Sequence, residues 1–118
     1  MVQIEAFKGL RYELGHVGAL SAVIAPPYDV IGPELQDELY KNHPANVIRL
    51  ILNRDEPGDE TGDEKYDRSA RALKQWQRDG IIQAETYPAV YVYHQQFEYD
   101  GQTFVRRGFM TRMKLEKL

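Results

Sequence analysis

The sequence predicts an α+β fold with a mixed sheet, two main helices and a C-terminal β-hairpin, and three observations point to it. Apolar residues recur at helical spacing in residues 33–40 and 64–79. Residues 89–97 are rich in β-branched and aromatic side chains, and an Asp-Gly pair typical of a hairpin turn follows them. With 118 residues, 42% hydrophobic and 28% charged, the chain has the size and composition of one globular domain.

Three short segments in the first half are predicted to be strands. In residues 2–6 apolar side chains alternate with polar ones, which is the period of a half-buried strand. The apolar run at 22–25 is ended by two prolines, which cannot donate to a sheet ladder, and it predicts a second strand. Residues 47–52 are apolar except at Arg49 and indicate a third, largely buried strand.

Two helices and an acidic loop are predicted between and after these strands. Pro33 suits the first position of a helix that runs to about residue 40, because proline loses no hydrogen bond there. The second helix covers residues 64–79, and Gly80 supplies its C-terminal stop. Residues 53–64 combine six acidic side chains with proline and glycine, which predicts a mobile acidic loop. Their spacing does not fit a calcium-binding loop.

The C-terminal part is predicted to be a β-hairpin. The first strand covers residues 89–97, Asp100 and Gly101 form the turn, and the return strand runs from Thr103 to about Leu115. Gly108 predicts a bulge or a close backbone approach in the return strand. Because this strand lies so near the end of the chain, we expect an incomplete domain.

Composition also excludes several classes of protein. No apolar run approaches the ~20 residues of a membrane span, so no membrane partner is expected. The chain has no cysteine, which excludes disulfides and thiolate sites and favours a cytoplasmic location. A net charge of −3 argues against nucleic acid as a partner. The three histidines show no metal-ligand spacing, so no metal site is predicted.

The segment at residues 25–31 is the most unusual in the chain. Pro26 and Pro27 hold Tyr28 and Asp29 in a fixed presentation at the end of a predicted strand, which is how many sites are built. The alternative is structural: Asp29 caps the following turn or helix, and Tyr28 packs against the sheet.

Five blocks of the sequence resemble the domain-of-unknown-function family 1015. In chain order they are Phe7-Lys8-Gly9-Leu10-Arg11-Tyr12, the Ala25 to Ile31 segment, Pro44-Ala45-Asn46-Val47-Ile48-Arg49-Leu50, Tyr91-Val92-Tyr93 and Arg107-Gly108-Phe109. The resemblance spans Phe7 to Glu116 but covers only the first part of a full-length member. It implies that residues 1–118 are a single N-terminal, partial domain whose partner is the missing C-terminal region of the same protein.

The resemblance also implies a chemistry for the longer protein. Family members carry downstream an Asp-Gly-His-His-Arg stretch like that of ParB and sulfiredoxin-type folds, which include free-serine kinases, and no such stretch occurs here. The implied activity is ATP-dependent phosphorylation of a small hydroxyl substrate such as serine, with ATP and Mg as cofactors of the full-length protein. This chain alone is then expected to be inactive.

Six residues are candidates for that site. Asp29 would be the catalytic base, because a substrate hydroxyl needs a carboxylate within hydrogen-bond reach. Arg11 and Arg49 would clamp a carboxylate or phosphate, for which a guanidinium fork is suited, although a structural ion pair is the alternative for each. The remaining candidates for substrate or phosphate binding are Tyr28, Asn46 and Arg107. Asn46 has the alternative of fixing a loop, and Arg107 lies on the opposite strand face from Arg106.

A second class of function is a protein-interaction or binding module without catalytic residues. In that case the hairpin sheet recruits a protein or the downstream region. Its distinguishing feature would be a large exposed apolar face on residues 89–115.

Overall fold

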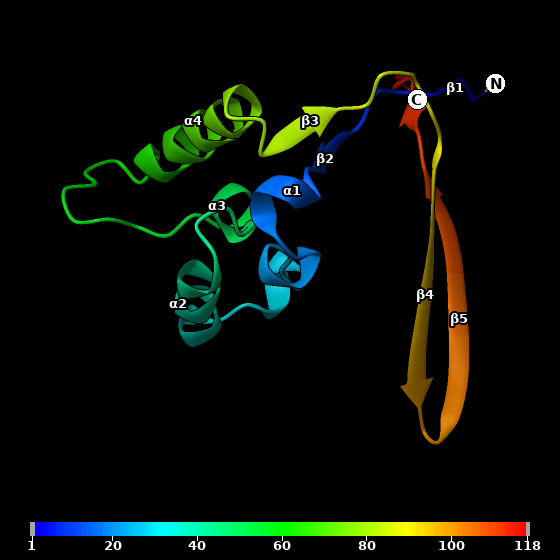
Figure 1. Ribbon diagram of the computed structural model, residues 1–118, viewed down its shortest axis with the longest axis horizontal. Helices are drawn as coiled ribbons and strands as arrows, with labels where there is room; N and C mark the ends of the chain where they lie inside the picture. The colour runs from blue at the N-terminus through cyan, green and yellow to red at the C-terminus, as the bar shows by residue number, and fades with distance from the viewer. Residues whose placement is uncertain (1, 118) are drawn as a thin grey trace. The chain divides into compact units, whose positions relative to one another are not determined.

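The computed structural model describes residues 2–117 and confirms the α+β class (Figure 1). The chain divides into two compact units. Unit 2 is continuous and comprises Arg11–Gln83, whereas unit 1 combines the chain up to Leu10 with the chain from Ala84 onward. The prediction of one partial domain for the whole chain stays a prediction.

The two predicted main helices are confirmed, and both belong to unit 2. Helix α2 is Pro33–Asn42, with proline in its first turn, and it buries Leu39. Helix α4 is Glu64–Arg78 and buries Trp76. Gly80 follows α4 with φ of 75°, a left-handed conformation that glycine adopts without strain.

Unit 2 has its own small core. Helix α1 (Leu14–Val17) and the two short 3₁₀ helices η1 (Leu20–Ala22) and η2 (Tyr28–Val30) precede α2. The core cluster brings α1 and the residue after η1 together with α4, and its buried members are Val17, Val23, Ala45, Trp76 and Ile82. Tyr12 and Leu73 pack against this cluster while remaining partly exposed.

Two predicted strands of unit 2 are wrong. Residues 22–25 form no strand; η1 occupies part of this segment, and the Val23 carbonyl accepts a hydrogen bond from the Val47 N–H. Residues 47–52 contain a helix instead, α3 (Ile48–Ile51). A short apolar run fits a buried strand and a buried helical turn equally well, because it shows no period that separates them.

The predicted hairpin is confirmed in unit 1, where it forms a long two-stranded ribbon (Figure 1). Strand β4 (Tyr91–Tyr99) pairs antiparallel with β5 (Gln102–Met110) along its full length. Asp100 and Gly101 have φ of 51° and 74°, the left-handed pair that a two-residue hairpin turn requires. The return strand is shorter than predicted, because it ends at Met110 and β6 (Arg112–Met113) follows separately.

The remaining strands are short. The strand predicted at residues 2–6 is found as β1 (Ile4–Glu5), which pairs antiparallel with β6. Strand β2 (Leu10–Tyr12) pairs with β3 (Ile82–Ala84). The mixed sheet that the sequence predicted is therefore wrong: the strands described in residues 2–117 pair in three two-stranded sheets.

Gly108 is not at a bulge, because it stands directly opposite Tyr93 in an unbroken register. Gly108 instead allows another group to approach the backbone closely, which was the second alternative in the same prediction. A Cβ atom at Gly108 would collide with the Tyr93 ring. Tyr91 lies over Gly9 in a similar way, and its hydroxyl accepts the Gly9 N–H at 2.7 Å.

Candidate functional site

The six candidate residues from the sequence fall into different units. Arg107 belongs to unit 1, and Arg11, Tyr28, Asp29, Asn46 and Arg49 belong to unit 2. Tyr28 and Asp29 lie in the 3₁₀ helix η2, where both are exposed. Pro27 begins this turn, since its carbonyl accepts the Val30 N–H at 3.1 Å. Both side chains therefore reach solvent, which is one of the two alternatives that the sequence left open.

The guanidinium of Arg49 contacts the end of α2 and the residue after it. It donates to the carbonyl of Tyr40 at 3.0 Å and to that of His43 at 2.8 Å, and it lies 4.5 Å from the centre of the Tyr40 ring. Burial is the main cause that lowers the pKa of Arg49. These contacts give Arg49 a structural role but leave part of its guanidinium fork for an anion.

Asn46 is fully buried and fixes the backbone around it. Its amide nitrogen donates to the carbonyls of Ala22 and Ile24 at 2.9 and 3.1 Å, and its amide oxygen accepts the Ile48 N–H at 2.9 Å. This is the loop-fixing geometry that the sequence allowed as the alternative to ligand binding. Because the nitrogen and the oxygen of the amide are both hydrogen-bonded and Asn46 has no exposed surface, its side chain is not available to a ligand.

Arg11 and Arg107 are both exposed side chains. Arg11 lies 3.7 Å from the Glu13 carboxylate, a separation at which an exposed pair contributes little. Arg107 stands opposite His94 in the hairpin, whereas Arg106 lies on the other face over the Phe97 ring. The predicted separation of the two arginines onto opposite faces is therefore confirmed.

One face of the hairpin carries most of its aromatic side chains. We call it the aromatic face, and its members are Tyr91, Tyr93, Phe97, Tyr99, Phe104 and Met110 with Gln95, Gln102, Arg106 and Gly108. Phe97 and Phe104 stack at 5.6 Å between ring centroids and remain 42% and 41% exposed. Within the hairpin no residue is fully buried, because only Tyr91 and Gly108 are even half-buried. The ladder orders the face, but no second layer in unit 1 covers it.

The other face of the hairpin is also exposed and is more mixed. Val92, Val105 and Phe109 alternate there with polar side chains such as His94 and Arg107. Apolar side chains therefore reach solvent on both faces of one two-stranded sheet. A soluble monomer normally shows such residues singly, and a contiguous patch marks an interaction site.

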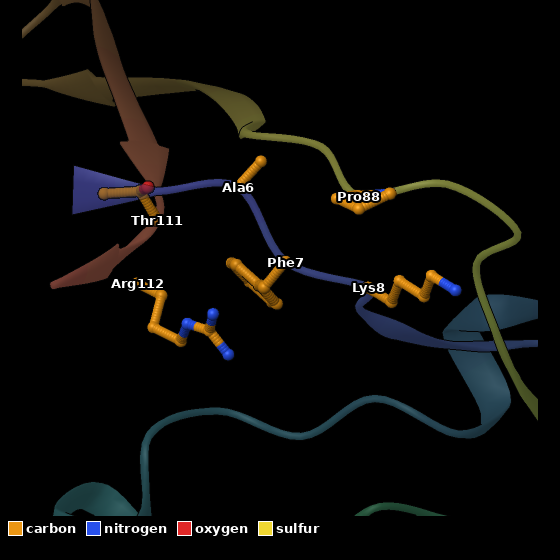
Figure 2. A pocket seen from close by; sticks show the side chains of 6 residues that line it. All are labelled: Ala6, Phe7, Lys8, Pro88, Thr111 and Arg112. Carbon is orange, nitrogen blue, oxygen red and sulfur yellow. The ribbon is translucent and has the colours of Figure 1, made fainter.

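A cavity of about 670 Å³ lies beside the base of the hairpin in unit 1 (Figure 2). Three segments line it, and Figure 2 shows their side chains: Ala6, Phe7 and Lys8 from one, Pro88 from another, and Thr111 and Arg112 from the third. Arg112 forms an ion pair with Glu5, and the Thr111 hydroxyl donates to the Glu5 carbonyl at 2.7 Å. Sequence patterns did not predict this cavity, because residues 6–8 of its wall lie about eighty residues or more from the other wall residues, Pro88, Thr111 and Arg112.

The acidic segment at 53–64 is a loop without helix or strand up to Asp63, as predicted. It is tied to α4, since Asp59 accepts two hydrogen bonds from the Arg68 guanidinium at 2.8 and 2.9 Å. Within residues 2–117, no cluster of acidic or histidine side chains could hold a metal ion. The same residues contain no helix long and apolar enough to cross a membrane.

These features define an α+β protein with an uncovered aromatic hairpin. The chain belongs to the family described as protein of unknown function (DUF1015), whose model matches residues 4–118. No curated protein and no solved structure matches the chain.

Proposed function

We propose that this chain is a protein-interaction module and that its β4–β5 hairpin docks a polypeptide. The observation that carries the proposal is the aromatic face, where Phe97 and Phe104 are stacked yet both about two-fifths exposed. A two-stranded hairpin is marginally stable in water by itself, so a partner layer would supply burial that it lacks. Exposed tyrosine, phenylalanine and arginine side chains are also the types that dominate binding energy at interfaces.

The occupant we propose is the downstream region of the same protein, which the resemblance to the family implies. Arg106 is the only charged side chain on the aromatic face. A matching surface would therefore be apolar and would place a carboxylate opposite Arg106, because a guanidinium pairs best with that group. Such a surface would exclude water from the stacked Phe97 and Phe104 rings.

Packing on the face is favoured over pairing at the edge of β5. Arg106 and Arg107 are adjacent on that strand, and neighbouring charges discourage a new strand from adding there. The partner would thus cover the aromatic side chains as a second layer. With this second layer, the marginally stable two-stranded sheet would become one of two packed layers.

The kinase that the resemblance implies is the weaker proposal. In it the longer protein is a cytoplasmic, ParB/sulfiredoxin-like enzyme that uses ATP and Mg on a serine-like hydroxyl, with Asp29 as the base. The exposure of Asp29 is compatible with that role. The Asp-Gly-His-His-Arg stretch on which the resemblance bases this activity does not occur in the chain, whereas the exposed aromatic face does, so we favour the interaction module.

The test is to measure binding between this chain and the downstream region produced as a separate polypeptide. Changing Phe97 and Phe104 together to glutamate should weaken the complex at least about thirtyfold, which corresponds to the ~2 kcal/mol of a single strong interface residue. Tyr66→Glu is the matched control, because Tyr66 is an exposed aromatic residue on α4 of unit 2. Amide exchange in β4 and β5 should also slow when the partner binds.

Two results would contradict the proposal. One is a complex that the double substitution leaves unchanged while circular dichroism shows the hairpin intact. The other is exchange in β4 and β5 that is equally fast with and without the downstream region.

A further inference from the structure

Four arginines meet at one pocket of unit 2, although the chain as a whole carries a net charge of −3. The pocket has a volume of about 350 Å³, within the range of small-molecule sites. Arg49 comes from α3, Arg54 from the acidic loop, and Arg68 and Arg71 from α4. Glu56 is the only acidic residue in its wall.

Two of these arginines are neutralised by carboxylates. Arg54 donates from Nε to Glu56 at 2.9 Å and lies 4.0 Å from Asp37. Arg68 forms a two-bonded pair with Asp59, and its Nη2 also donates to the Arg54 carbonyl at 2.6 Å. These pairs fix the shape of the wall.

The other two arginines carry positive charge that no carboxylate matches. Arg49 is bonded to backbone carbonyls, and both it and Arg54 lie over the Tyr40 ring, at 4.5 and 4.2 Å from its centre. Burial is the main cause that lowers the pKa of Arg49, the electrostatic effect of Tyr40 opposes it, and the neighbouring charge of Arg54 lowers it further. The Arg71 side chain is exposed and forms no hydrogen bond or ion pair within residues 2–117.

Arg68, which lines the pocket, also has one buried donor atom without a partner. Nε of Arg68 is buried and makes no hydrogen bond. Because this atom has almost no exposed surface, it does not itself face a ligand, and the positive charge of the pocket comes from its guanidinium groups as a whole. An oxyanion in the pocket would supply negative charge and several acceptors at once.

We propose that this pocket binds the phosphate group of a small phosphorylated molecule. Guanidinium groups match phosphate oxygens with two parallel hydrogen bonds, and several of them are suited to a dianion. Arg49 and Arg71 are the binding residues, and Arg54 and Arg68 hold the wall through their carboxylate partners. The site belongs to unit 2 alone and does not depend on the hairpin.

The experiment titrates the full 118-residue chain with inorganic phosphate at constant ionic strength and follows binding by calorimetry. Arg71→Gln should weaken phosphate binding by about tenfold, since one charge-assisted hydrogen-bonding group is lost. Lys74→Gln is the matched control, because it removes the same charge from the next turn of α4 and does not line the pocket. It should leave the dissociation constant unchanged. The guanidinium N–H resonances of Arg49 and Arg68 should shift on binding in the unmodified chain.

Three outcomes would overturn the proposal. The first is the absence of saturable binding at millimolar phosphate. The second is equal weakening by Arg71→Gln and Lys74→Gln, which would indicate screening of the general surface charge. The third is acetate binding as tightly as phosphate, which would assign the pocket to a carboxylate.

Discussion

Unit 2 and the β4–β5 hairpin obtain their order in different ways. Unit 2 buries a core in which Val23 and Ile48 have no exposed surface. The hairpin has no buried side chain, and its order comes from the ladder, the Asp100–Gly101 turn and the Tyr93 ring over Gly108. We infer that unit 2 resists unfolding by packing, whereas the hairpin depends on local geometry and on what docks against it.

The largest expected effect is in the core of unit 2. Ile48→Ala should lower the free energy of unfolding by about 4 kcal/mol, because it removes buried methyl groups and leaves a cavity. Val105→Ala in the hairpin is the matched control and should cost about 0.5 kcal/mol or less, since Val105 is 47% exposed. Urea denaturation of both variants measures the difference. Similar losses of unfolding free energy in the two variants would contradict the inference that packing stabilises unit 2 more than the hairpin.

The second expected effect concerns the buried amide. Asn46→Ala should cost about 3 kcal/mol, because it leaves the Ile48 N–H and two backbone carbonyls without their partner. The same denaturation experiment measures it. Asn53→Ala, which removes one partly buried amide bond to the Arg49 carbonyl, is the control and should cost about 1 kcal/mol. A loss at Asn46 no greater than at Asn53 would remove the loop-fixing role.

The contacts of Asn46 also show why some parts of the fold could be predicted from the sequence and others could not. Helices α2 and α4 and the hairpin turn have local signals: a proline at the start, a glycine after the end, an Asp-Gly pair. The helix at residues 48–51 has no such signal. Its first turn is held by Asn46, which is bonded to Ala22 and Ile24 more than twenty residues away, and local patterns do not contain that contact.

The candidate sites show the same limit. A fixed presentation of Tyr28 and Asp29 could be predicted, because two prolines fix the backbone beside them, whereas their exposure was one of two alternatives. The arginine pocket could not, since Arg68 and Arg71 read as ordinary charges on the solvent side of a helix. Only the fold brings them to Arg49 and Arg54. The alternation of side chains along the strands predicts which residues share a face of the hairpin. It does not predict which face another layer covers, so an exposed aromatic face was only one of the possibilities.

The third prediction tests whether local geometry orders the hairpin. Gly108→Ala should destabilise the hairpin by about 1 kcal/mol, because the new methyl group displaces the Tyr93 ring. Amide exchange in β4 and β5 should speed up, and exchange in α4 should not change. Tyr93→Ala combined with Gly108→Ala is the control, and the second substitution should then cost almost nothing. If the glycine substitution costs the same in both backgrounds, the ring contact is irrelevant.

The smallest effect is expected in the acidic loop, which is ordered by an ion pair rather than by a core. Hydrogen bonds from the Arg68 guanidinium, and then from the Glu56 N–H, lower the pKa of Asp59 to about 2. Because the folded pKa lies below the ordinary value of about 3.9, the stabilisation is complete above that value and is lost as the pH falls towards 2. Asp59→Asn should therefore reduce the loss of stability between about pH 5 and about pH 2.

Asp55→Asn provides the control for that measurement. Asp55 is exposed and lies 3.6 Å from Lys65, a pair that solvent screens, so this variant should keep the pH dependence of the unmodified chain. Denaturation at the two pH values compares all three proteins. If Asp59→Asn and Asp55→Asn behave alike, the loop is not held by the Arg68 pair, and the wall of the arginine pocket that Arg68 forms would lose its support.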